Sequence, residues 1–244
     1  LAIGFAGKKK SETMTDFLTA GKSGGMFVMV CTYIGAHVGN GIVVGGAQYG
    51  AEYGIGGVWF GLGACLSYVL FALVMSRLLY TRGYITIPDL IRDRYKSKFA
   101  SVLMAVLNIC ATLGIMAAQI MAGCALFEAL GLNPTLGGVL MAVVVFIYCS
   151  ISGMWGVMMT DVIQVGVIFA CTLIALVYMI SDGAFTVMHA TLNASEWGLF
   201  NADPEAIVMN AVPGMLYGLV SCASFQRNTS AKDEKTAFNS ALWG

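Results

Sequence analysis

Charged residues are scarce in this chain. Only 11% of its 244 residues are Asp, Glu, Lys or Arg, whereas a soluble domain carries about 25%. Six long stretches contain no charge at all: 23–51, 53–76, 99–127, 129–160, 162–181 and 206–226. About 20 apolar residues span a bilayer core. The sequence therefore predicts an all-α membrane protein, a multi-pass helical bundle forming a single transmembrane domain over 1–244, with spans at approximately 24–51, 54–77, 99–127, 133–152, 157–181 and 206–226.

Other absences exclude whole classes of function. The formal net charge is zero, so nothing indicates a nucleic-acid partner. All seven Cys fall inside apolar stretches without metal-ligand spacing, which favours core packing. No nucleophile–base pair, metal cluster or phosphate-binding loop is present, so we expect neither an enzyme nor an organic cofactor. The chain begins within the apolar segment 1–7, and we expect it to be a piece of a longer membrane protein.

The few basic residues form three groups, which indicate the topology. They lie at 8–22, 77–98 and 227–235, separated by two and then four expected spans. An even number of spans returns the chain to the same side, and cytoplasmic loops collect Lys and Arg. We therefore expect a multi-pass protein of the cell membrane with these loops in the cytoplasm. The segment 182–205 would lie on the opposite side with a short surface helix, while 86–91 predicts a short cytoplasmic helix with Pro88 in its first turn.

One carboxylate, Asp161, lies between two long apolar runs. No Lys or Arg occurs between Lys98 and Arg227, so no basic residue close in sequence can pair with it. An ionisable group inside a membrane segment is costly unless it faces a partner, water or an ion, which makes Asp161 a candidate functional residue. The alternative is a carboxylate satisfied by Thr160, Gln164 or a helix N-terminus.

Two of the expected spans contain helix breakers. The first reads GAHVGNG at 35–41, which predicts an unwound midpoint lining a cavity, the alternative being a tightly packed helix that tolerates its glycines. The sixth carries Pro213–Gly214 and then Tyr217–Gly218, so we expect an interruption there. Transporters place interrupted segments at corresponding positions of two repeats. This order predicts a five-plus-five inverted repeat truncated early in its second half.

Four motifs in order carry a resemblance to a known family. Residues 153–164 (GMWGVMMTDVIQ) match its most characteristic stretch, although Met154 replaces a second glycine. The other three are the loop after the second core helix, the cytoplasmic Gln-Arg segment and the approach to the first core helix, at 84–95, 226–233 and 16–22 respectively. The chain thus resembles the sodium:solute symporter family over nearly its whole length.

The resemblance implies a LeuT-like fold and sodium-coupled uptake of a small organic solute by alternating access. In that family one sodium ion lies between carbonyls of the broken first core helix and hydroxyls of the eighth. These carbonyls correspond to Ala36 and Gly39, and the eighth helix would lie beyond Gly244. The family's fifth-helix aspartate corresponds to Asp161, serving a sodium exit path or an additional sodium site.

Four polar residues are candidates for solute contact. His37 and Asn40 flank the break of the first span, and Gln119 lies in the middle of the third. Tyr217 aligns with an aromatic residue that closes the site in some members. Structural hydrogen bonds or ordinary packing are the alternatives for these residues.

The solute and the biological context stay open at this level. Sugar-transporting members of the family place polar or acidic groups on the second core helix, whereas residues 58–64 here offer only Trp59 as a polar-capable side chain. The resemblance therefore disfavours a sugar and leaves an amino acid, a carboxylate or a vitamin. The alternative to a transporter is a membrane sensor module ahead of a signalling domain. The sequence after Gly244 would discriminate between the two.

Overall fold

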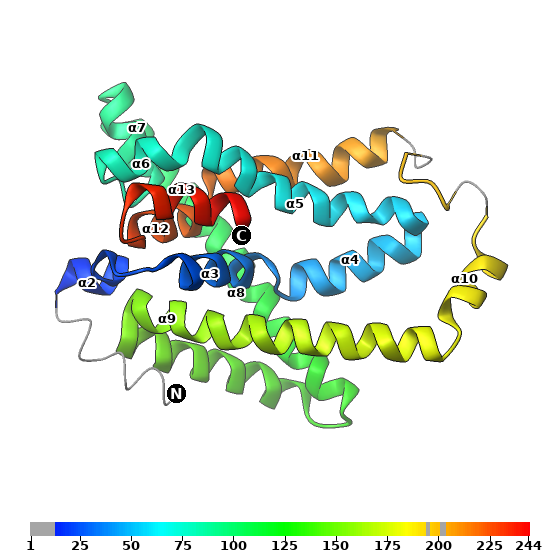
Figure 1. Ribbon diagram of the computed structural model, residues 1–244. Helices are drawn as coiled ribbons and strands as arrows, with labels where there is room; N and C mark the ends of the chain where they lie inside the picture. The colour runs from blue at the N-terminus through cyan, green and yellow to red at the C-terminus, as the bar shows by residue number, and fades with distance from the viewer. Residues whose placement is uncertain (1–12, 194–195, 201–203) are drawn as a thin grey trace.

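The computed structural model describes residues 13–193, 196–200 and 204–244, with the side chains of residues 40 and 148 excepted. These residues form helices and no named strand, apart from one isolated bridge between Gly24 and Ala231. The prediction of an all-α helical bundle is confirmed (Figure 1). Residues 1–7, expected to be the tail of an earlier apolar segment, lie outside the described part.

The first expected span is broken at its centre. Helices α2 (Met14–Thr19) and η2 (Ala20–Lys22) lead into α3 (Met26–His37), and α4 (Asn40–Tyr53) follows after two residues. Val38 has a ψ of 68° and Gly39 adopts an extended backbone with φ −112° and ψ −167°. The predicted unwound midpoint is confirmed, and the break separates two short helices (Figure 1).

The chain then reverses through η3 (Gly54–Gly57) into α5 (Val58–Phe71), which runs antiparallel to α4 (Figure 1). A π-helical turn, η4 (Ala72–Ser76), joins α5 to α6 (Arg77–Arg82). The predicted short helix after it is confirmed as α7 (Ile87–Tyr95), with Pro88 in its first turn. Thr86 and Asp89 cap its N-terminus reciprocally, which explains why the helix begins there.

Two long apolar segments form one side of the bundle. They are α8 (Lys98–Ala129) and α9 (Pro134–Ser181), and α9 reverses direction at Gly153, where φ is 53° and ψ is −149°. A Cβ atom at Gly153 would lie 2.6 Å from the Phe17 carbonyl oxygen. Glycine is therefore required both by the backbone angles and by the close approach of α2. The two arms of α9 lie side by side in Figure 1.

The last part of the chain contains α10 (Ala184–Thr191), α11 (Pro204–Val220), α12 (Cys222–Ser230) and α13 (Glu234–Trp243). Helix α10 confirms the short helix predicted within 182–205. The interruption predicted at Pro213–Gly214 is wrong in position, because α11 stays helical through both residues. The break lies at Ser221, where α11 and α12 meet at a bend of 49°.

Close packing explains why α11 stays helical at its proline. A Cβ atom added to Gly63 of α5 would lie 2.4 Å from the Ala211 carbonyl oxygen, and one on Gly218 would lie 2.8 Å from the Ser67 carbonyl oxygen. The glycines thus let α5 and α11 approach backbone to backbone. Contacts with neighbouring helices make a proline tolerable within a membrane helix.

Among the described residues, three helical segments are long and apolar enough to cross a membrane by themselves: Gly41–Arg82, Lys98–Ala129 and Cys149–Ser181. The bent pair α11–α12 could make a fourth, and Met26–His37 and Pro134–Ile147 are shorter apolar helices. The first of the long segments contains the reversal between α4 and α5. The boundaries of the six expected spans stay a prediction.

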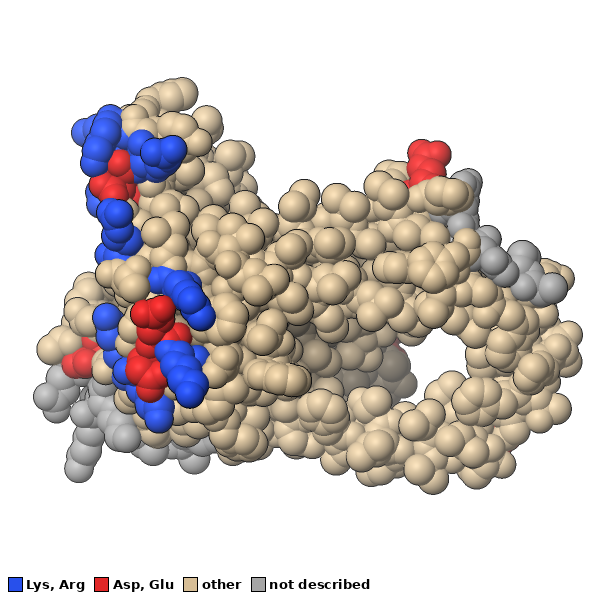
Figure 2. Space-filling view, turned by 45° about the horizontal axis from the view of Figure 1, so that its top comes forward, with Lys and Arg blue, Asp and Glu red and all other residues tan. Residues whose placement is uncertain are grey.

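Basic side chains gather at one end of the bundle. Figure 2 shows the visible Lys and Arg at the end that carries α7 and the α12–α13 region, with the long apolar flanks nearly free of charge. Large apolar side chains such as Phe146 and Ile174 are 73% and 69% exposed on those flanks. A surface that is charged at its end and apolar along its sides is suited to a bilayer.

Candidate functional site

The break between α3 and α4 is surrounded by side chains from α5 and α11. The His37 ring, at the end of α3, lies 4.2 Å from the Tyr68 ring and 5.9 Å from the Tyr217 ring, measured between centroids. Its Nε2 atom lies 3.4 Å from Ser67 Oγ. The break therefore brings together an imidazole, a hydroxyl and two phenol rings from three separate helices.

Ser67 connects His37 to the backbone of α5. The Ser67 hydroxyl donates to the Ala64 carbonyl at 2.6 Å, and its oxygen lies 3.4 Å from His37 Nε2. A hydroxyl that donates to a carbonyl can still accept a hydrogen bond from a ring N–H.

Helix α8 meets the same break through Gln119. A Cβ atom added to Gly39 would lie 3.6 Å from Gln119 Nε2. The Gln119 amide therefore faces the unwound segment directly at Gly39. Three residues predicted to contact the solute thus lie around the break between α3 and α4: His37, Gln119 and Tyr217. Asn40 is the first residue of α4, and its side chain lies outside the described part.

The two predicted sodium-binding carbonyls lie on either side of this break. Ala36 is in the last turn of α3, and Gly39 immediately precedes α4. The Gly39 carbonyl accepts the Val43 amide at 3.1 Å, which leaves its second lone pair available. Both carbonyls therefore belong to the unwound segment or its border, where helical hydrogen bonding is incomplete.

Asp161 lies in a second cluster, buried between α3, α9 and α12. Thr32 of α3 donates its hydroxyl hydrogen to Asp161 Oδ2, and Arg227 Nη2 of α12 lies 3.4 Å from the same oxygen. The Arg227 and Asp161 side chains are only 10% and 9% exposed. Asp161 therefore does have a basic partner, Arg227, which lies far from it in the sequence.

Thr32 completes the network. Arg227 Nε donates to the Thr32 carbonyl at 2.9 Å and approaches its hydroxyl oxygen at 3.1 Å. The Thr32 hydroxyl thus accepts from the guanidinium and donates to the carboxylate. Gly35, one turn further along α3, allows this approach, because a Cβ atom there would lie 3.1 Å from Asp161 Cβ. Thr160, proposed from sequence as a partner of Asp161, donates instead to the Val157 carbonyl at 2.8 Å.

Comparison with known proteins identifies the family to which this broken helix and its buried acidic residue belong. The profile of the sodium:solute symporter family matches residues 17–244. The chain belongs to the sodium:solute symporter family. The resemblance inferred from four motifs is confirmed.

Several relatives of this symporter-family chain have named solutes. It is 28% identical to the sodium/pantothenate symporter of Haemophilus influenzae over 220 residues, which cover 86% of the chain and 43% of the relative. It is 27% identical over 221 residues to the high-affinity choline transporter 1 of Torpedo marmorata, covering 85% and 36%. It is 26% identical over 230 residues to an osmoregulated proline transporter of Bacillus subtilis, covering 90% and 46%. The chain spans less than half the length of these relatives.

Sequence reasoning missed four residues of these clusters: Thr32, Ser67, Tyr68 and Arg227. Arg227 carried a usable signal, because it directly follows a long uncharged stretch and belongs to the Gln-Arg motif. Thr32, Ser67 and Tyr68 carried none, since each is one polar-capable residue among many apolar ones. Only the packing of α3 against α9, and of α5 against α3 and α11, brings them to the site.

Proposed function

We propose that the chain forms part of a sodium-coupled secondary active symporter that imports a small organic solute by alternating access. One observation carries the proposal: the unwound segment at Val38–Gly39, around which His37, Gln119 and Tyr217 converge, in a chain of the sodium:solute symporter family. Unwound backbone at membrane depth provides carbonyl ligands for a cation without burying a charge.

In this proposal the carbonyls of Ala36 and Gly39 bind sodium, and His37, Asn40, Gln119 and Tyr217 contact the solute. The neutral His37 ring presents an acceptor without repelling a nearby cation. Tyr217, whose ring centroid lies 5.9 Å from that of His37, is proposed to close the site. The named relatives transport pantothenate, choline and proline, so we expect a small polar solute of this size range.

The test is uptake by the full-length protein in proteoliposomes. Pantothenate, choline and proline form the first panel, each measured with an inward sodium gradient and with the same gradient of potassium. We expect one solute to accumulate only with sodium. Equal uptake in the two salts, for a solute that the protein does transport, would contradict sodium coupling.

Asp161 is proposed as a point where sodium binds or passes. Both of its described hydrogen bonds use Oδ2, so Oδ1 can still accept a cation. Arg227 already neutralises the carboxylate in this conformation. A sodium ion arriving at Asp161 would therefore share the carboxylate with Arg227 or displace it, and such exchange suits a transit site.

Three variants separate a sodium role for Asp161 from a purely structural one. Asp161→Asn and Arg227→Gln each remove the ion pair, but only the first removes the negative charge proposed to attract sodium. We expect Asp161→Asn to weaken apparent sodium affinity in uptake by about tenfold or more, whereas Arg227→Gln removes the competing cation and should leave that affinity unchanged or strengthen it. Asp182→Asn, at the exposed end of the same helix, is the control. If Asp161→Asn and Arg227→Gln shift the sodium dependence equally, the carboxylate acts only through its ion pair.

The number of coupled ions is measurable from accumulation. One charge crossing 100 mV gains about 2.3 kcal/mol, and a tenfold sodium gradient adds about 1.4 kcal/mol. One sodium ion therefore supports roughly 500-fold accumulation of a neutral solute, and two support about the square of that ratio. A steady-state ratio well above 500-fold under these conditions would establish a second coupled ion.

The relatives described above are named as transporters or symporters, and no observation favours the sensor module.

A further inference from the structure

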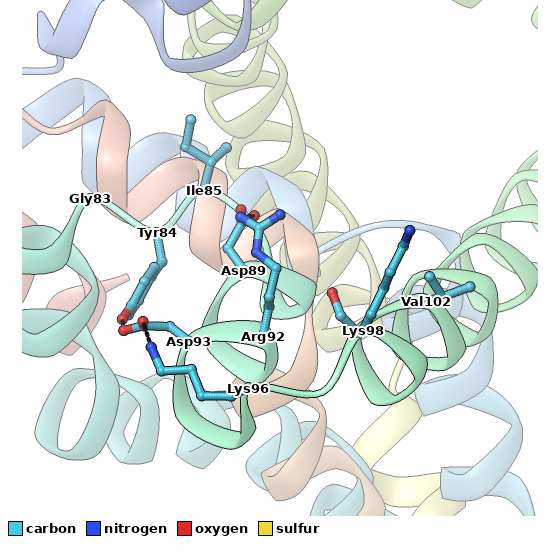
Figure 3. Close-up of a pocket in the computed structure, with 10 residues that line it drawn as sticks. Gly83, Tyr84, Ile85, Asp89, Arg92, Asp93, Lys96, Lys98 and Val102 are labelled. Carbon is cyan, nitrogen blue, oxygen red and sulfur yellow. Dashed lines mark hydrogen bonds and ion pairs between the residues drawn. The ribbon is translucent and has the colours of Figure 1, made fainter.

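A surface pocket of about 840 Å³ lies at the basic end of the bundle, between the loop after α6 and the start of α8. Figure 3 shows polar side chains on its floor, including Tyr84, Arg92, Asp93 and Lys98, with Ile85 and Val102 at its margins. The residues of the break and of the Asp161 cluster do not line it. The pocket is therefore a separate place in the fold.

The two acidic residues of the pocket already have partners. Asp89 accepts the Thr86 hydroxyl at 2.7 Å and pairs with Arg92 at 3.2 Å. Asp93 accepts Lys96 at 2.8 Å and also the Tyr84 hydroxyl. These hydrogen bonds, that of Lys96 first, hold the pKa of Asp93 below its usual range. Arg82 also lies 3.9 Å from Asp93, so both carboxylates are held in local pairs, with Arg92, Lys96 and Arg82.

Positive charge is in excess at this corner. Five basic and two acidic residues fall between positions 82 and 98. Lys98 and Arg94 form no ion pair with any residue in the described part of the chain. Figure 3 shows Lys98 extending away from the Asp93–Lys96 pair, with no dashed line to another residue. The pocket therefore presents at least one uncompensated cation beside the Arg92 guanidinium.

Exposed apolar side chains on α8 lie at and beside this pocket. Val102, which lines the pocket, is 54% exposed, and Phe99, one turn earlier on the same helix, is 78% exposed. Helix α8 continues as an apolar helix to Ala129. Tyr95, just before this corner, is 68% exposed. Exposed aromatic residues beside Lys and Arg are typical of the level of the lipid headgroups. The charged residues of the pocket could bind the polar part of an amphiphilic molecule, and the apolar residues beside them could contact its hydrocarbon part.

We propose that this pocket binds the headgroup of an anionic phospholipid. The phosphate contacts Lys98 and Arg92, and the acyl chains lie along Phe99 and Val102 on the first turns of α8. Basic residues at a membrane surface attract anionic lipids. A free phosphate ion would use the cations but would gain nothing from the exposed apolar wall beside them, so the lipid is the favoured source of the phosphate group.

The test uses the full-length protein, purified in detergent and stripped of lipid, with three probes. These are short-chain phosphatidylglycerol, short-chain phosphatidylcholine and glycerol phosphate, and binding is followed by microscale thermophoresis. We expect saturable binding of phosphatidylglycerol and affinities at least about tenfold weaker for the other two. Equal binding of phosphatidylcholine would exclude charge recognition, and equal binding of glycerol phosphate would exclude the lipid.

Variants then locate the site. Lys98→Gln with Arg92→Gln is expected to weaken phosphatidylglycerol binding about 30-fold, and Lys98→Gln alone about fivefold. The matched control is Lys22→Gln with Lys235→Gln, which removes the same charge outside the pocket and is expected to change binding about twofold or less. The single variant covers the case in which the double variant does not fold. Equal losses in pocket and control variants would overturn the proposal in favour of general attraction to the basic end.

Discussion

At the scale of single residues, Thr32 has the most demanding role. Its hydroxyl accepts from Arg227 and donates to Asp161, and the side chain is fully buried. A buried ion pair persists only if further hydrogen bonds satisfy its remaining polar atoms. Thr32 provides such bonds from both its hydroxyl and its carbonyl. The hydroxyl therefore connects the first half of the broken span to two other helices.

Replacing Thr32 by Val tests this role with almost no change of shape. The carboxylate loses a donor and the guanidinium an acceptor, so we expect a loss of about 1–3 kcal/mol in stability. The measurement is the thermal unfolding midpoint of the full-length protein in detergent. Thr172→Val is the control, because that exposed hydroxyl bonds to the Ile168 carbonyl of its own helix and to no other residue in the described part of the chain, and we expect a change within about 0.5 kcal/mol. Equal effects of the two substitutions would show that the network adds no stability.

At the scale of helices, the pairing of α5 with α11 depends on glycine. The closest approach is at Gly63, whose added Cβ atom would meet backbone atoms of Ala211. Backbone atoms cannot move aside as the end of a flexible side chain can. This pairing also positions the Tyr68 and Tyr217 rings on two sides of His37.

Gly63→Ala is therefore expected to separate α5 from α11 and to destabilise the protein by about 1–3 kcal/mol. The change should also lower solute affinity, since the ring positions around His37 depend on this pairing. Gly61→Ala is the matched control on the same helix, because nothing lies within 4 Å of an added Cβ atom there. We expect that control to be neutral or slightly stabilising. Thermal midpoints and uptake affinity of the two variants provide the comparison, and equal behaviour would contradict the close packing.

At the scale of the whole molecule, the distribution of charge predicts an orientation. Basic residues gather at one end, as Figure 2 shows, while the sides are apolar. Basic loops stay on the cytoplasmic side of a membrane. We therefore expect α7 and the α12–α13 region in the cytoplasm, and α10 on the opposite side.

Cysteine labelling on intact cells tests this orientation. In a background without the seven native Cys, Glu52→Cys should react with a membrane-impermeant maleimide, because this exposed residue lies in the last turn of α4, at the end away from α7. Lys235→Cys should react only after the membrane is made permeable. If Lys235→Cys were labelled in intact cells and Glu52→Cys were not, the orientation would be the opposite of the one expected here. Solute uptake by both variants serves as the control for folding.

Local composition predicted much of this protein. Apolar runs indicated the membrane class, and the GAHVGNG segment located the break of the first span, because breakers act through their own backbone angles. Pro213–Gly214 misled the same reasoning. There α5 approaches so closely that packing holds α11 helical, and the chain bends at Ser221 instead.

The sequence by itself determined that the chain is a helical membrane protein, that the helix expected at 24–51 is broken near Gly39, and that its motifs are those of sodium:solute symporters. These features depend on short-range composition and on residue order. Only the tertiary structure decided that Asp161 pairs with Arg227 through Thr32, and that His37 contacts Ser67 and Tyr68. The physical reason is that a buried polar group takes its partner from whichever helix packs against it. That choice is made by the fold and not by distance along the chain.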